Sequence, residues 1–506
     1  MPYTDFHVHG NMKTFFSGYD VADKKNPWEN VSVWVDDLLF RENNRILHSQ
    51  ASFQQLKDGD LGLAVMPLYS TERGFVKAWL LRLIDLLTKK ISGKLFRAIR
   101  SNKKTYWEQA QDYYQHLQRA ATEKEYAGSE NVNFTYCFED IVPGKMNIII
   151  SMEGAHSFLD TEEDVAIPSG IDKIIARIKK YKQRVPTEGY PRIFILNLTH
   201  LTYAPFSNHA FGMKMITHKD FIPQGKGLSP AGLRVMDTIV GYDKDSYPIL
   251  IDIKHMSLQA RKEYYELRRT RYPKIPVLAS HAGCTGISWD NIPDYITEIR
   301  SPWLNHRKCN VVSFRTKPKG LLPETEFNPW SINLYDEDIV EIFNSGGIIG
   351  LSLDQRIIGC GKVANEKMSK EETYQGVKPT RPLYYFNPFE PKAIQDADLH
   401  FRHFCNTIFH IVKTGEKLRN PDVPFDPWKQ IVIGSDFDGM IDAVDFCINA
   451  TQYDNIKKYF VEKFAALAEE ANIVLPNTPL AIAEDMLYNN GYAFLQKYYS
   501  KNAFPA

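Results

Sequence analysis

Cysteine is scarce in this chain of 506 residues. The six cysteines are Cys137, Cys284, Cys309, Cys360, Cys405 and Cys447, and no two of them form a Cys-x-x-Cys pair. Cysteines so far apart exclude a disulfide framework and a cysteine-based zinc site. We interpret them as reduced thiols, which fits a cytoplasmic protein. No signal peptide is visible, because the first expected strand begins at the first residues of the sequence. A leader that has been removed is the alternative.

Net charge is also absent. The chain has 61 Lys and Arg against 61 Asp and Glu, which gives a net charge of zero. This balance argues against a nucleic acid or another polyanion as a partner. Hydrophobic residues make up 43% and charged residues 24%, the composition of an ordinary globular protein.

An uninterrupted apolar run long enough to span a membrane is missing. The most apolar candidate, residues 75–100, places Trp79, Leu83 and Leu87 at helical spacing but has Lys and Arg among them. The charges exclude a membrane span. We expect a helix packed on the core of the protein, with a membrane-surface helix as the alternative.

Eight short apolar runs alternate with helix-like segments along the whole length. They are residues 1–7, 62–68, 147–152, 192–199, 248–254, 275–280, 348–353 and 431–435. Runs that are β-branched and nearly continuously apolar indicate strands buried on both faces. Eight β-α units in a row predict an α/β fold, a (β/α)8 TIM-type barrel spanning residues 1–506 as one domain. A doubly wound open sheet is the alternative, but no Gly-x-Gly-x-x-Gly follows any strand.

Polar residues stand at the carboxyl ends of six of these runs. They are His7 and His9, Glu153, His200, His255, His281 and Asp436. The carboxyl ends of barrel strands converge on one face of the barrel, so we expect these five histidines and two carboxylates to lie close together there. Imidazole and carboxylate together indicate a metal site, zinc above all.

The number of candidate ligands predicts two metal ions, because one zinc takes about four ligands. Glu153 is the carboxylate placed to bridge them. Two ions about 3.5–4 Å apart clamp a hydroxide and polarise a carbonyl. Asp436 is the candidate general base and acid, unless it is a structural ligand. His200 is the candidate for stabilising the oxyanion, and Asp252 either orients His255 or caps a buried turn.

Seven segments of the chain resemble those of a known family. The matching segments are Asp-Phe-His-Val-His at 5–9, Ser-Met-Glu-Gly-Ala-His at 151–156, Leu-Asn-Leu-Thr-His at 196–200, Gly-Leu-Ser-Pro-Ala-Gly at 227–232, Asp-Ile-Lys-His-Met-Ser at 252–257, Pro-Val-Leu-Ala-Ser-His at 276–281 and Gly-Ser-Asp-Phe-Asp-Gly at 434–439. Their set and order resemble the membrane (renal) dipeptidase family of the amidohydrolase superfamily. The resemblance implies a barrel with two zinc ions, bridged by Glu153, that cleaves peptide bonds.

It also implies a role for each residue. His7 and the residue at 9 join Glu153 on one zinc, and His255 and His281 join Glu153 on the other. His200 polarises the substrate and Asp436 carries the proton.

The chain departs from the family at two places. The family usually has His-x-Asp where this chain has His7-Val8-His9, which removes one negative charge but keeps a ligand. Asp290 stands where the family has an arginine that holds the substrate carboxylate. A compensating cation is then needed, and Arg356 is the candidate, unless it only pairs with Asp354. If no cation compensates, the substrate is neutral or cationic at that end.

Two long loops, 282–335 and 355–393, are rich in proline and aromatic residues. Loops of this length indicate lids or binding loops; the alternatives are a contact in a homodimer and a disordered excursion.

The sequence therefore predicts a two-zinc amide hydrolase acting on a dipeptide or other small molecule. The alternatives are a related amidohydrolase acting on an N-acyl amino acid, lactone or modified peptide, and a silent barrel that binds a partner.

Overall fold

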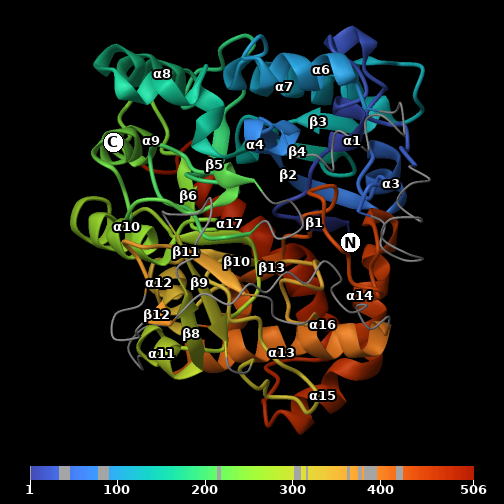
Figure 1. The fold of residues 1–506 in the computed structure, drawn as a ribbon. Coiled ribbons are helices and arrows are strands. Elements are labelled where there is room, and N and C mark those ends of the chain that lie inside the picture. The colour runs from blue at the N-terminus through green and yellow to red at the C-terminus, as the bar shows by residue number, and fades with distance from the viewer. Residues whose placement is uncertain are drawn as a thin grey trace.

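The fold is built around one sheet of parallel strands (Figure 1). The computed structural model describes residues 2–32, 46–77, 91–212, 218–300, 309–314, 317–361, 365–373, 379–380, 396–417 and 426–505. Eight strands follow one another around the sheet: β1 (Tyr3–Asp5), β2 (Leu61–Tyr69), β4 (Met146–Glu153), β5 (Ile193–Asn197), β6 (Leu250–Asp252), β7 (Leu278–Ala282), β10 (Ile348–Leu351) and β13 (Ile431–Ile433). Each predicted run forms one of them, and the predicted (β/α)8 barrel is confirmed. A short strand, β3 (Val132–Phe134), pairs beside β4.

Backbone hydrogen bonds draw the first and last strands together. The Phe6 N–H donates to Ile433 O at 2.8 Å, and the Asp436 N–H donates to His7 O at 2.8 Å. The buried Asp5 carboxylate accepts hydrogen bonds from the His7 N–H, the Ser435 N–H and the Tyr453 hydroxyl. These contacts fix His7 beside Asp436, two residues 429 positions apart in the chain.

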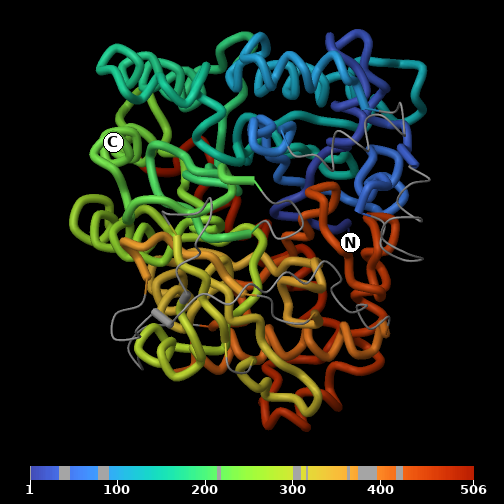
Figure 2. The backbone as a smooth tube through the Cα atoms, viewed as in Figure 1, coloured from blue at the N-terminus to red at the C-terminus, as the bar shows by residue number. Residues whose placement is uncertain are grey.

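Helices cover the outside of the strands (Figure 1). The longer ones between strands are α7 (Tyr106–Thr122), α8 (Pro168–Lys180), α9 (Pro230–Val240), α10 (Leu258–Arg271), α12 (Asp336–Asn344) and α13 (Ala397–Glu416). Helix α7 shows why they form: Thr105 and Glu108 cap its first turn reciprocally, and Ala110, Tyr113 and Leu117 bury one face. The chain ends with α14 (Tyr453–Tyr459), α15 (Ala465–Glu470), α16 (Pro479–Glu484) and α17 (Asn490–Tyr498). Figure 2 shows the C-terminal segment beside the end of α9, where the rings of Phe504 and Tyr242 are 5.4 Å apart.

Residues 75–100 do not form one helix in their described part. Helix α4 (Arg73–Lys77) comes first, and α6 (Gly93–Arg100) starts anew after Ser92, whose side chain accepts a hydrogen bond from the Leu95 N–H. Residues 78–90 lie outside the described residues. Phe75 and Leu95 are buried in one apolar cluster, so the expected packing on the protein's own core holds for these segments. No helix in the described parts of the chain has the length and apolarity needed to cross a membrane.

The two long loops contain a small second sheet that the sequence did not predict. Its strands are β8 (Ile296–Arg300), β9 (Cys309–Phe314), β11 (Glu366–Ser369) and β12 (Pro379–Thr380). Strand β11 of the second loop pairs antiparallel with β9 of the first. The two loops are therefore joined into one unit. Several of their aromatic residues, Trp303, Tyr384, Tyr385, Phe386 and Phe389, lie outside the described residues. All six cysteines are free thiols, as expected.

Candidate metal centre

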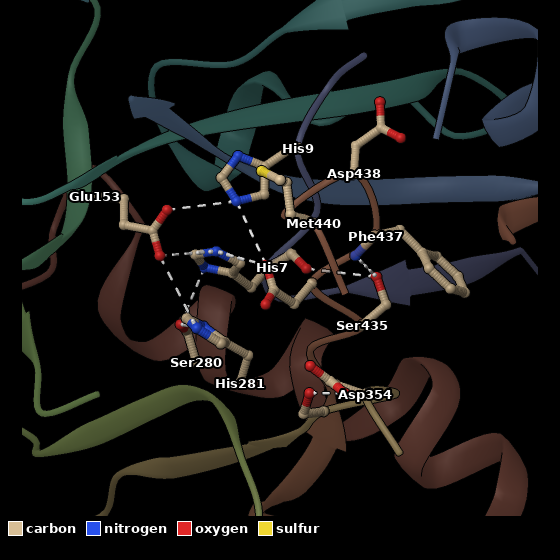
Figure 3. A network of polar contacts seen from close by, with 12 residues as sticks. His7, His9, Glu153, Ser280, His281, Asp354, Ser435, Phe437, Asp438 and Met440 are labelled. Atoms are coloured by element: carbon tan, nitrogen blue, oxygen red, sulfur yellow. Dashed lines mark hydrogen bonds and ion pairs between the residues drawn. The ribbon is translucent and has the colours of Figure 1, made fainter. Parts of the chain in front are cut away.

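The barrel brings five predicted histidines and both carboxylates to one place. Strand β1 ends at Asp5, so His7 and His9 follow the strand rather than lie on it as expected. The His9 N–H donates to Phe437 O, and the Val8 N–H donates to Val65 O. These bonds hold the segment beside β2 and the residues that follow β13. Both imidazoles are buried and face the same cluster (Figure 3).

Glu153, the last residue of β4, lies at the middle of the cluster (Figure 3). Its Oε2 atom is 3.4 Å from His9 Nε2, while its Oε1 atom is 3.4 Å from His255 Nε2. His7 Nε2 is 3.6 Å and His281 Nε2 3.9 Å from Oε1. Oε1 thus faces His7, His255 and His281, and Oε2 faces His9. By the proximity of their ligand atoms to one another, the histidines fall into two groups. The first, with His7 and His9, also includes Asp436, and the second consists of His255 and His281.

These distances fit the ligand set of zinc. Zinc–nitrogen distances of about 2.0–2.1 Å place two ligands of a tetrahedral ion about 3.4 Å apart. In the second group, His255 Nε2 and His281 Nε2 are 3.2 Å apart and share Glu153 Oε1. Burial lowers the pKa of His7, His255 and His281 well below the ordinary value. Neutral imidazole is the form that binds metal. The two Nε2 atoms are also within hydrogen-bond distance of each other, with the donor set by the tautomer.

Two of the converging residues have strained backbones. His255 has φ of 69° and Asp436 has φ of 62°, both in the left-handed region that favours glycine. Strain at such positions persists where surrounding structure holds it, often at functional sites. The Asp436 carboxylate is 3.4 Å from His9 Nε2 and is 16% exposed, whereas Glu153 is 2% exposed. Asp436 is therefore the more solvent-accessible carboxylate of the cluster.

His200, after β5, joins the cluster through a partner that the sequence analysis missed. Its Nε2 atom is 3.4 Å from Glu153 Oε1, and its Nδ1 atom is 2.6 Å from Glu72 Oε1. Glu72 is buried in the turn after β2 and also accepts a hydrogen bond from the Tyr69 hydroxyl. The sequence did contain a signal for Glu72. Six of the eight strands were expected to end in a polar site residue, β2 was one of the two that were not, and Glu72 follows β2.

Asp252 was expected either to orient His255 or to cap a buried turn, and its described hydrogen bonds are those of a cap, with none to His255. Its carboxylate already accepts hydrogen bonds from Asn197 Nδ2, the Lys254 N–H and the Ser280 N–H, and from the Ser280 hydroxyl. With four donors in place, Asp252 is a poor metal ligand, although it lies near His7 and His281.

A buried cation, Lys254, was also missed. Its side chain is 3% exposed, and its Nζ atom has no hydrogen-bond partner among the described residues. Burial lowers the pKa of Lys254 to about 8, and the negative charges of Asp436, Asp252 and Asp354 limit the decrease. The cluster therefore holds a positive charge of its own.

The structure treats the two predicted substrate-binding residues differently. The Arg356 guanidinium makes two-pronged hydrogen bonds to Asp354, with Nη2 2.6 Å from Oδ2, and also donates to Met440 O. This is the pairing expected as the alternative role for Arg356. Asp290 is exposed in a turn, and its neighbour Trp289 donates to Glu337 on α12 and stacks on Tyr265 of α10. Among the described contacts, none joins Asp290 to the histidines.

Comparison with known proteins gives similarity in structure only. No family model matches the chain, and no curated protein matches it. The metallopeptidase dipeptidase AC superposes with a TM-score of 0.50 at 12% identity, over 99% of both chains. A Rhodobacter sphaeroides metallopeptidase, solved with a phosphinate mimic of the dipeptide L-Ala-D-Ala, gives 0.48 at 12% identity over 98% of this chain and 99% of that one. The probable dipeptidase PvdM from Pseudomonas aeruginosa gives 0.46 at 14% identity over 88% of each. At such identities the first likeness shows a shared fold.

Proposed function

We propose that this protein is a two-zinc hydrolase that cleaves the amide bond of a dipeptide or similar small molecule. The observation that carries the proposal is the position of Glu153 among four histidines, with His9 beside Oε2 and His7, His255 and His281 beside Oε1. The fold of dipeptidase AC, named a metallopeptidase, supports it.

The proposed ligands follow from the two groups. His7 and His9 with Glu153 would hold one ion, and His255 and His281 with Glu153 the other. When bound, a pair of zinc ions supplies Lewis acid chemistry that polarises the scissile carbonyl and increases the acidity of water.

Asp436 is the proposed proton carrier. Its carboxylate lies 3.4 Å from His9 Nε2 and is more exposed than that of Glu153. It therefore contacts the histidine cluster and is accessible to water from solvent. Asp436 takes the proton of the water whose oxygen attacks the carbonyl carbon. As the carbon–nitrogen bond breaks, it delivers that proton to the leaving amine.

His200 is proposed to stabilise the charge that develops on the carbonyl oxygen. Burial alone lowers the pKa of His200, but the negative charges of Glu153 and Glu72 raise it to about 9. Nδ1 is bonded to Glu72, which leaves the Nε2–H, 3.4 Å from Glu153 Oε1, to donate to the carbonyl oxygen.

The experiment is a hydrolysis assay on zinc-loaded protein. Wild type, Asp436→Asn and Arg356→Ala are tested with a dipeptide, its C-terminal amide and its N-acetyl derivative. Asparagine preserves shape but carries no proton, so we expect Asp436→Asn to lose at least about 100-fold in kcat, with near-normal zinc content. Because Arg356 pairs with Asp354, Arg356→Ala is expected to change KM for the free acid and for the amide alike. A larger rise in KM for the free acid would instead make Arg356 the cation that binds the substrate carboxylate.

Three results would count against parts of this account. Wild-type turnover by Asp436→Asn would make that residue structural. Cleavage of the N-acetyl derivative alone would favour an N-acyl amino acid hydrolase. No cleavage of any amide by protein that holds zinc would favour a silent binding barrel.

A further inference from the structure

The hydroxyl of Ser280 lies between two candidate ligands that belong to different metal positions. Its Oγ atom is 2.8 Å from His281 Nδ1 and 3.1 Å from His7 Nδ1, and it also contacts Asp252 Oδ2. All four side chains are at most 2% exposed. Figure 3 shows Ser280 beside the rings of His7 and His281, on the side away from His9.

The direction of each hydrogen bond follows from Asp252. Its Oδ1 accepts the N–H groups of Lys254 and Ser280 at 2.9 and 3.1 Å, and its Oδ2 accepts Asn197 Nδ2 at 2.8 Å. A carboxylate surrounded by donors acts as an acceptor, so the single proton of the Ser280 hydroxyl points to it. The lone pairs of Oγ are then left to accept an N–H from each imidazole.

This arrangement determines which nitrogen each histidine offers to a metal. With the proton on Nδ1, the lone pair is on Nε2. His7 Nε2 faces Glu153 and Asp436 at 3.6 and 3.8 Å, and His281 Nε2 faces His255 Nε2 at 3.2 Å. Both lone pairs therefore point into the cluster.

We propose that Ser280, anchored by Asp252, is a positioning residue that sets the tautomer and ring direction of one histidine ligand at each of the two metal positions. The inference rests on the proposed two-zinc function. His9 Nδ1 and His255 Nδ1 have no hydrogen-bond partner among the described residues. In each pair of histidines, Ser280 therefore hydrogen-bonds the Nδ1 atom of one member, His7 in the first pair and His281 in the second. Both metal positions depend on the same hydroxyl.

The experiment measures zinc affinity by competition with a chromophoric chelator, in wild type, Ser280→Ala and Ser280→Thr. Loss of such a support typically weakens metal binding roughly 10- to 100-fold. We expect Ser280→Ala to weaken both binding steps, and Ser280→Thr, which keeps the hydroxyl, to recover them. The absorption bands of cobalt-substituted Ser280→Ala should shift for both ions.

Ser151→Ala is the matched control. Ser151 is a buried serine on β4, two residues from Glu153, and its hydroxyl has no hydrogen-bond partner among the described residues. It should bind zinc as wild type does. Wild-type affinity in Ser280→Ala, or weakening of only one step, would overturn the inference while leaving the two-zinc function standing. Failure of wild type itself to bind zinc would instead contradict the proposed function.

Discussion

At the scale of single residues, Glu72 and His200 form a buried pair whose charges depend on each other. Burial alone would raise the pKa of Glu72, but the charge and hydrogen bond of His200 lower it to about 2. Glu153 and Glu72 together outweigh burial and raise the pKa of His200 to about 9. The unfolded values are about 4.3 for Glu and 6.5 for His. In metal-free protein, the pair is therefore ionised over a wide range of pH.

The pair should make stability depend on pH in a defined direction. The raised pKa of His200 contributes stability that is complete below about pH 6.5 and is lost as the pH rises through 9. The lowered pKa of Glu72 contributes stability that is present above about pH 4.3 and is lost as the pH falls through about 2. Glu72→Gln should therefore destabilise metal-free protein most at pH 5–6.5, by up to about 3 kcal/mol, and less at pH 9.

Denaturant unfolding of chelator-treated protein at pH 5.5 and 9 measures this difference. Glu162→Gln is the control, since Glu162 pairs with Arg73 and Tyr106 rather than with a histidine. An equal cost of Glu72→Gln at both values of pH would show that the pair does not ionise as described.

At the scale of elements, a buried ion pair joins α10 to α12. Arg261 Nη1 is 2.7 Å from Asp338 Oδ2, and both side chains are at most 1% exposed. The same guanidinium donates to Ser331 O and Asn333 O in the first long loop. The Tyr265 hydroxyl and the Tyr335 N–H also donate to Asp338. This network attaches the end of the first loop to two barrel helices.

Breaking one side of the network should be costly. Arg261→Met leaves the buried Asp338 charge without its cation, which typically destabilises by about 3–5 kcal/mol. Arg269→Met on the same helix is the control, because its pairs with Glu266 and Glu341 are near the surface and worth about 1 kcal/mol or less. Denaturant unfolding compares the two, and similar small costs would contradict the role given to the network.

The sequence predicts the elements of the barrel well and those of the loops poorly. The runs that become β4 and β13 are nearly continuously apolar because they are buried on both faces. Strand β9 is only partly buried and pairs with β11 more than 50 residues away, so neither periodicity nor a turn signal marks the small sheet. The helix expected over 75–100 is interrupted where Ser92 begins a new helix.

At the scale of the whole molecule, barrel topology gathers residues that are far apart in the chain. Parallel strands place their carboxyl ends on one face, so His7, Glu153 and His281 could be predicted to meet. Glu72 was missed because it follows β2 by three residues in a turn, although no other polar residue had been assigned to the end of that strand. Ser280 could not be predicted, because one hydroxyl inside a strand shows no sign of contacting two histidines. Asp290 was placed by likeness of motif, and the contacts of its turn lead to the outer helices instead.

The central claim is a centre of two metal positions that share Glu153, and zinc stoichiometry tests it most directly. Protein stripped with a chelator, then supplied with zinc and freed of excess, is measured by elemental analysis alongside Glu153→Gln. The account predicts two zinc ions per wild-type chain and a clear loss in Glu153→Gln. One ion or none bound to folded wild-type protein would contradict it.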